Sequence, residues 1–277
     1  NCNILLQTYF GDVRDIYEDI INKPFAGVGL DFNEGRKTFE LVEKYGFPAG
    51  KLLFAGVVNG KNIWKNNYKK TLDLISSIKN ACDNNINVVI STSCSLLHVP
   101  YTLKHEDKLA DSYKIHFSFA EEKLTELAEL GVLADKKQDK VKSENAYIDN
   151  QKVFEEERNC HNAEVKERLA NIKEEDYVRL PLRSERQKLQ KEKLGLPEFP
   201  TTTIGSFPQT KEIKAERAAY RKNEISEEEY TQYIKKQIAD CVKWQEEIGL
   251  DVLVHGEYER NDMVEYFGEA LEGYLFT

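Results

Sequence analysis

Two stretches in the last third of the chain combine polar side chains with glycine and proline in a way that suits ligand binding. The first, FPTTTIGSFPQT at residues 199–210, is a β-rich run that leads into Gly205, which permits close backbone approach, and Ser206, which offers a hydroxyl and an amide. Pro208 then blocks continuation of a strand ladder. The pattern predicts a strand whose end exposes backbone groups to a ligand. A tight turn without a ligand needs the same residues and is the alternative.

The second stretch, LDVLVHGE at residues 250–257, is a run of buried-strand residues that leads into a histidine, a glycine and a glutamate. A strand of a β/α barrel delivers polar groups to the carboxyl-terminal mouth in this manner. Glu257 is the candidate binding group, whereas His255 is better interpreted as a packed or hydrogen-bonded residue at the strand end. The segment ERND at residues 259–262 either orients Glu257 or begins a helix.

The cysteines offer no metal site of their own. Cys2, Cys82, Cys94, Cys160 and Cys241 are widely scattered, with no C-x-x-C pair and no nearby histidine at the spacing of zinc ligands. We interpret them as reduced thiols that are mostly buried.

Two further motifs have both a chemical and a structural interpretation. STSCSLLH at residues 91–98 places Cys94 four residues before His98, but catalytic pairing depends on a geometry that this spacing does not establish. NGKNIW at residues 59–64 is a polar loop with a tryptophan that is able to stack on a flat ring of a ligand. We favour a structural role for both motifs.

The first third of the chain alternates short apolar runs with helical patterns. ILLQTYF, FAGVGLDF, KLLFAGVV and INVVIST are each followed by a stretch with apolar residues at three- and four-residue spacing, the last of them a long helical region over residues 106–130. Strands that are apolar on both faces and alternate with amphipathic helices indicate parallel β/α units. Four such units fit before residue 130.

The middle of the chain differs in kind. Residues 136–194 are dense in charged side chains, with sparse apolar residues at roughly helical spacing, and this composition predicts a solvated helical connector. The β/α pattern then resumes. Ser226 with Glu229 is a capping-box signature, and the long apolar stripe that follows ends at Gly249, a plausible C-cap.

About four strands precede the connector and two follow it, whereas a closed β/α barrel needs eight. We therefore expect an α/β protein of the (β/α)8 TIM-barrel type, present as two partial barrels, and a piece of a larger protein. The predicted parts are the second half of one barrel (1–133), a helical connector (134–198) and the first part of another barrel (199–277). An open doubly wound sheet is the alternative, but no G-x-G-x-x-G turn supports it.

Composition narrows the class of function. The 277 residues are 40% hydrophobic and carry 39 Lys plus Arg against 48 Asp plus Glu, a net charge of −9. This acidic balance argues against a surface for nucleic acid or for an anionic membrane. No run approaches the length of a membrane helix, and no secretory signal begins the sequence. We expect a cytoplasmic protein.

FPTTTIGSFPQT, together with LDVLVHGEYERNDMVEYFGE at residues 250–269, closely resembles the start of the catalytic domain of the cobalamin-independent methionine synthase family. LQTYFGDVRD, AGVVNGKNIW and STSCSLLHVP resemble the latter half of the N-terminal barrel of that family. The motifs are long and follow the family order along nearly the whole chain. Agreement is weakest in the connector.

The resemblance implies two (β/α)8 barrels and a zinc-dependent methyltransferase that transfers the N5 methyl group of 5-methyltetrahydropteroyl polyglutamate to homocysteine without cobalamin. The zinc ligands of the family correspond to positions downstream of this chain, so no metal ligand or catalytic residue is assigned here. Ile204, Gly205, Ser206 and Glu257 match the residues that contact homocysteine or methionine. A zwitterionic amino acid needs donors for its carboxylate and an acceptor for its ammonium, which these positions provide.

The resemblance also implies that this chain alone is inactive and that the full-length enzyme is a monomer. A truncated, non-catalytic interaction or scaffold protein of the same family is the alternative. A downstream segment with the zinc ligands would favour the enzyme, and a stop codon after residue 277 would favour the alternative.

Overall fold

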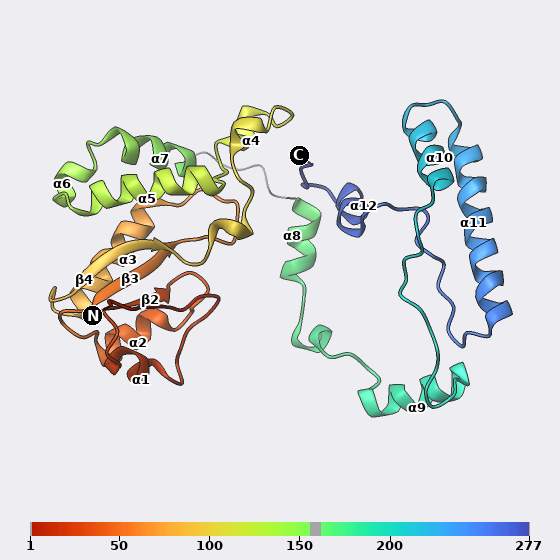
Figure 1. Cartoon of the computed structure of the whole chain (residues 1–277), viewed down its shortest axis with the longest axis horizontal. Coiled ribbons are helices and arrows are strands. Elements are labelled where there is room, and N and C mark those ends of the chain that lie inside the picture. The colour runs from red at the N-terminus through yellow and green to blue at the C-terminus, as the bar shows by residue number, and fades with distance from the viewer. Residues whose placement is uncertain (1, 156–161, 277) are drawn as a thin grey trace. The chain divides into compact units, whose positions relative to one another are not determined.

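The computed structural model describes residues 2–155 and 162–276, and these two ranges belong to two separate compact units (Figure 1). The division lies inside the segment that the sequence predicts as a connector, 134–198. The three-part domain division stays a prediction.

The first unit is built on a four-stranded parallel sheet in the order β1-β2-β3-β4. The strands are β1 (Leu5–Gln7), β2 (Gly27–Asp31), β3 (Leu52–Val58) and β4 (Asn87–Thr92). The four predicted strands are confirmed. The expectation that all are buried on both faces holds best for β2, in which every residue is buried. β1 and β4 are the outer strands, and they are more exposed because each has a neighbour on one side only.

Helices α1 to α3 pack on one face of this sheet. Val28 and Leu30 of β2 share a hydrophobic cluster with Leu53, Ala55 and Val57 of β3 and with buried residues of all three helices. These strand residues alternate along each strand, so they lie on one face. The opposite face carries Gly27, Gly29, Asp31, Phe54 and Gly56, among which small residues prevail. The sheet is therefore covered by helices on the face that carries its aliphatic side chains.

The helices of the first unit, in chain order, are α1 (Tyr17–Asn22), α2 (Thr38–Tyr45), α3 (Tyr68–Ala81), α4 (Asp111–Lys114), α5 (Ala120–Ala134), α6 (Gln138–Val141) and α7 (Asn145–Glu155), with 3-10 turns at Leu96–His98 and Leu103–His105. The prediction of one long helical region over 106–130 is wrong. The segment between α4 and α5 is extended, because Phe117 and Phe119 are buried in a cluster with Leu109, and Ser118 N donates to Ile63 O at 2.7 Å.

The second unit is mainly helical. Its helices are α8 (Ala163–Ala170), α9 (Arg183–Leu194), α10 (Lys211–Arg221), α11 (Glu227–Ile248) and α12 (Met263–Glu269), with a 3-10 turn at Glu174–Tyr177. The predicted capping box is confirmed, since Glu229 N donates to Ser226 Oγ at 3.2 Å and Ser226 N to the Glu229 carboxylate at 2.8 Å. Gly249, with φ of +78°, ends α11 in the left-handed conformation, as predicted.

The two strands predicted for the second unit, over residues 201–204 and 251–255, are not formed as strands. The two segments lie side by side, but they share one isolated parallel bridge, between Ser206 and Gly256. The reason is local. Thr201 N donates to the side chain of Asp251 at 2.7 Å, so a carboxylate takes the place that a backbone carbonyl has in a ladder.

The predicted connector is charged and largely exposed where the structure describes it. Val165 and Leu169 on α8 are 53% and 60% exposed, so their apolar stripe is not packed against the second unit. No helix within 2–155 or 162–276 is long and apolar enough to cross a membrane.

Candidate functional site

The stretches singled out in the sequence are brought together in the second unit. Val252 N donates to Thr201 O at 3.0 Å, and Phe207 N donates to Gly256 O at 3.0 Å. The first segment runs into α10, which is capped by Thr210, and the second follows the end of α11. The helix pair α10 and α11 therefore brings residues 201–207 alongside residues 251–257.

Of the four predicted binding residues, Gly205 and Glu257 lie in direct contact. A Cβ on Gly205 would stand 2.5 Å from Glu257 Oε1, so a side chain at this position would force the carboxylate to shift. Ser206 is exposed and forms the bridge to Gly256. Ile204 is 85% exposed. The structure thus places all four at one end of the paired segments.

Glu257 stands on a sharp turn of the backbone. Gly256 has φ of +85° and Glu257 has φ of +59°, so two successive residues are left-handed. Gly256 is buried, and a Cβ there would lie 2.5 Å from the ring of Tyr258. A left-handed conformation costs a non-glycine residue free energy, and such residues gather where the surrounding structure requires a particular side-chain position.

Arg260 pairs with both neighbouring carboxylates. Its Nη2 lies 2.7 Å from Glu257 Oε1, and its Nη1 pairs with Glu259 Oε1. The guanidinium is only 14% exposed, which limits its motion. His255 Nδ1 accepts a hydrogen bond from Glu257 N at 3.1 Å and lies 3.5 Å from Glu259 Oε2. His255 is a hydrogen-bonded residue of the turn, as the sequence suggested.

A buried arginine on α10 supports the same turn. Arg217 is 8% exposed, and its Nη2 donates to Tyr258 O at 2.9 Å, to Arg260 O at 3.2 Å and to Gln209 Oε1 at 2.8 Å. Gln209 Nε2 in turn donates to Glu257 O at 3.3 Å. The sequence analysis missed both residues. The available signal was a charged residue four positions after Ile213, on the buried stripe of an amphipathic helix.

The residues of the two remaining motifs make contacts inside the first unit, and their structural role stays a prediction. Cys94 is buried, and burial raises the pKa of its thiol, which disfavours the nucleophilic thiolate. His98 packs its ring against Phe10, with ring centroids 5.0 Å apart. Trp64 contacts the ring of Phe117, with centroids 5.4 Å apart, and pairs with it in an antiparallel bridge.

The described residues do not fit a zinc ion. Within 2–155 and 162–276, no three His, Cys, Asp or Glu side chains gather closely enough to hold a metal. Cys2 is exposed and Cys82 is half-buried, whereas Cys94 and Cys241 are buried, in different units. Two of these four free thiols are therefore buried, fewer than the sequence analysis expected. Cys160 lies outside the described residues.

Comparison with known proteins finds the same family at both ends of the chain. Residues 1–83 match the family model described as the N-terminal domain of cobalamin-independent synthase, and residues 199–277 match its catalytic domain.

Curated relatives match along the whole chain. The 5-methyltetrahydropteroyltriglutamate–homocysteine methyltransferase of Lactococcus lactis subsp. lactis (strain IL1403) is 52% identical over 277 residues, which are 100% of this chain and 35% of the relative. The proteins with the same name from Streptococcus sanguinis (strain SK36) and Bifidobacterium adolescentis (strain ATCC 15703) are each 52% identical, over 274 and 275 residues. The chain thus spans about a third of the length of these relatives.

Proposed function

Because the chain belongs to the cobalamin-independent synthase family, we propose that it is part of a methyltransferase that transfers the N5 methyl group of 5-methyltetrahydropteroyltriglutamate to homocysteine, making methionine. Its own contribution is part of the homocysteine and methionine site. The observation that carries this assignment is the contact of the Glu257 carboxylate with the backbone at Gly205.

In this site Glu257 accepts hydrogen bonds from the ammonium group of the amino acid. Arg260 forms an ion pair with Oε1 of the carboxylate. We assign the ligand ammonium to the second oxygen, Oε2. The exposed hydroxyl of Ser206 and the backbone N–H groups beside it are the donors for the ligand carboxylate. Ile204 exposes an apolar side chain at the same end, where it flanks the aliphatic part of the ligand. Arg217 and Arg260 are positioning residues, because they hold the turn on which Glu257 stands.

We propose further that the two units belong to two partial barrels of the (β/α)8 type, joined by the charged helical segment. The parallel order of β1 to β4 supports this arrangement. The packing of α1 to α3 on one face of the sheet supports it too, because a barrel wall carries its helices on the outside.

Zinc is the metal that the resemblance to the family implies for the complete enzyme. The resemblance implies that its ligands lie downstream of this chain, and residues 2–155 and 162–276 hold no group of side chains able to bind a metal. No step of the reaction is assigned to it here. The part played by this chain is to bind and orient the amino acid.

The test is the homocysteine dependence of methyl transfer, measured on the complete gene product at saturating folate for Glu257→Gln. A hydrogen bond to a charged group is worth about 1.5 to 3 kcal/mol, so we expect homocysteine use to weaken roughly 10- to 150-fold. Wild-type behaviour of this variant would show that Glu257 is not the ammonium partner. Absence of methionine formation by the wild-type gene product would remove the proposed function itself.

Glu247→Gln is the matched control. Glu247 lies near the end of α11, its side chain is 60% exposed, and Lys243 Nζ is 3.8 Å away. The substitution makes the same change of charge away from the turn, so it should leave the homocysteine dependence unchanged. Glu259→Gln is less suitable, because Glu259 shares Arg260 with Glu257.

A further inference from the structure

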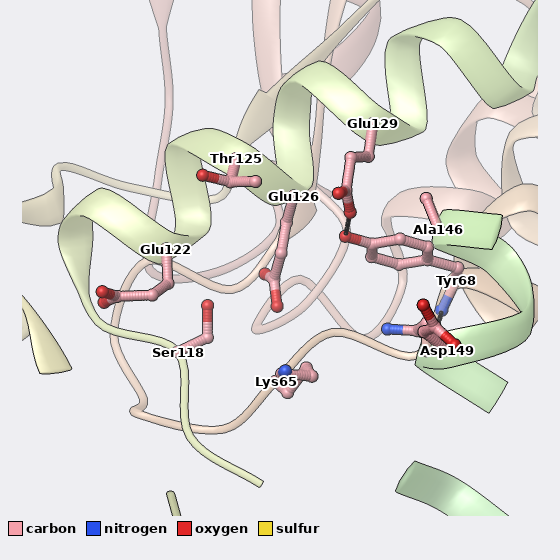
Figure 2. Close-up of a pocket in the computed structure, with 10 residues that line it drawn as sticks. Lys65, Tyr68, Ser118, Glu122, Thr125, Glu126, Glu129, Ala146 and Asp149 are labelled. Atoms are coloured by element: carbon pink, nitrogen blue, oxygen red, sulfur yellow. Dashed lines mark hydrogen bonds between the residues drawn. The ribbon is translucent and has the colours of Figure 1, made fainter. Parts of the chain in front are cut away.

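A second polar pocket lies in the first unit, on residues that the methyltransferase proposal does not use. It has a volume of about 280 Å³ and is formed by the loop after β3, the start of α3, and helices α5 and α7 (Figure 2). Among its lining residues are Lys65, Tyr68, Ser118, Glu126, Glu129 and Asn150.

One wall of the pocket is held in place by internal hydrogen bonds. Tyr68 OH donates to Glu129 Oε2, and Tyr68 N donates to Asn150 Oδ1 at 3.0 Å. Asn150 Nδ2 donates to Asn66 O at 2.8 Å. Burial and the neighbouring Glu129 carboxylate raise the pKa of Tyr68, which therefore stays a hydrogen-bond donor. These groups are already paired, and they fix the shape of the site.

Two buried atoms of pocket-lining residues, Glu126 Oε2 and Ser118 Oγ, have no hydrogen-bond partner among the described residues. Glu126 is 4% exposed; its Oε1 accepts from Asn66 N at 2.9 Å, whereas its Oε2 is buried without a hydrogen bond to any residue within 2–155 or 162–276. Ser118 is fully buried, and its Oγ is likewise unpaired in the described parts of the chain. The hydroxyl is near enough to the carboxyl to lower its pKa, but the two do not meet in hydrogen-bond geometry. Leaving a buried polar atom unpaired costs free energy, so both atoms favour a bound partner.

A positive charge faces the same space. Lys65 is half-buried and lines the pocket. Burial raises the pKa of the Glu126 carboxyl, and the Lys65 ammonium is close enough to oppose that rise in part. Figure 2 shows Lys65 below the carboxyl group of Glu126, with Ser118 to one side. Lys123 also acts on the charge of Glu126, but its ammonium is fully buried and donates to Trp64 O at 3.1 Å. Lys65 is therefore the cation that a ligand would meet.

The arrangement selects against simple ions. A plain amine meets acceptors at Glu126 and Ser118 but is repelled by Lys65. A plain carboxylate meets Lys65 but is repelled by Glu126 and by the other lining carboxylates, those of Glu122, Glu129 and Asp149. A ligand with an ammonium and a carboxylate on one carbon satisfies Glu126, Ser118 and Lys65. We propose that this pocket binds a small zwitterionic α-amino acid, whose ammonium donates to Glu126 Oε2 and Ser118 Oγ and whose carboxylate accepts from Lys65.

The test is isothermal titration of L-alanine into the full chain carrying Glu257→Gln, so that the site in the second unit does not contribute. We expect a dissociation constant on the order of 1 mM, a usual value for so small a ligand. Ethylamine and propionate each lack one charged group of L-alanine, and each should bind at least 10-fold more weakly. The proposal is overturned if no binding is detected at L-alanine concentrations up to about ten times the expected dissociation constant. It is also overturned if ethylamine or propionate binds as tightly as L-alanine.

Two variants locate the binding. Glu126→Gln keeps an oxygen for Asn66 N but loses the negative charge, and Lys65→Met keeps the stem but loses the ammonium. Each should weaken L-alanine binding 10-fold or more, whereas Lys69→Met, at an exposed surface pair with Asp73, should not. If circular dichroism shows that Glu126→Gln is unfolded, Lys65→Met decides. Unchanged affinity in a folded Lys65→Met chain would mean binding elsewhere and would overturn the proposal.

Discussion

Glu257 and Gly205 are packed so closely that a Cβ on the glycine would stand 2.5 Å from Oε1 of the carboxylate. The two residues are supplied by different segments, which meet at the bridge between Ser206 and Gly256. The backbone at 205 therefore defines where the carboxylate lies. A substitution that adds a side chain at residue 205 would therefore move the Glu257 carboxylate while every polar group of the site is still present.

Gly205→Ala should impair homocysteine use by the complete gene product. The added methyl group would displace the Glu257 carboxylate, and we expect the KM for homocysteine to rise about 10-fold, which corresponds to about 1.4 kcal/mol. Gly131→Ala is the control, since a Cβ at this position in α5 would meet no atom within 4 Å. Equal KM values for the two variants would show that the close contact has no bearing on binding.

Arg217→Met should destabilise the second unit. The guanidinium donates to three oxygens in a buried position, and its loss leaves the carbonyls of Tyr258 and Arg260 without this donor. We expect a loss of about 2 to 4 kcal/mol in the free energy of unfolding, measured by urea denaturation. Arg221→Met, at an exposed side chain 3.8 Å from Glu265, should cost less than about 0.5 kcal/mol. A similar loss for both variants would contradict the role given to Arg217.

The capping box of α11 should make the stability of this helix sensitive to acid. Hydrogen bonds from the backbone N–H and the hydroxyl of Ser226 hold the pKa of Glu229 below its usual 4.5. Because the pKa in the folded state is lowered, the stabilisation is complete above pH 4.5 and is lost as the pH falls through the folded pKa. Carbon-detected NMR titration of Glu229 should give a pKa below 4.5 that moves upward in Ser226→Ala. An unshifted wild-type pKa would contradict the capping box.

Lys188→Ala and Lys191→Ala should change the stability of the complete gene product by less than about 0.5 kcal/mol each. Both residues lie on α9, where they are exposed. A loss several times larger in denaturant melts would mean that this face of the helix is covered in the complete protein.

The first unit follows closely from its sequence pattern. Short apolar runs predict strands, and amphipathic stretches predict the helices between them, because both periodicities reflect burial on one core. The same argument from periodicity gave the wrong prediction for the region around Phe117. Its apolar residues are compatible with a helix, and only the cluster with Leu109 and the backbone contact with Ile63 select an extended chain. Such long-range contacts leave no local signature.

The candidate site was predictable in its residues but not in its geometry. Gly205 and Glu257 lie in conspicuous motifs, yet their contact depends on how α10 and α11 pack. Arg217 was missed because the carbonyl groups that it binds, at Tyr258 and Arg260, are 41 and 43 residues further along the chain. From the sequence alone, a charged residue within a helix is predicted to lie on the face that is exposed to solvent.

The spacing of the paired segments has a consequence for the order of folding. Helices α10 and α11 are joined by a short turn and stack Tyr220 on Tyr230, so their docking closes a small loop (Figure 1). Thr201 and Asp251 are 50 residues apart, and closing that loop in a disordered chain costs more conformational entropy. We therefore expect the helical hairpin to form first and to serve as the template on which the amino-acid site assembles last. Substitutions at the hairpin would then slow the maturation of the site even where the finished site is unaltered.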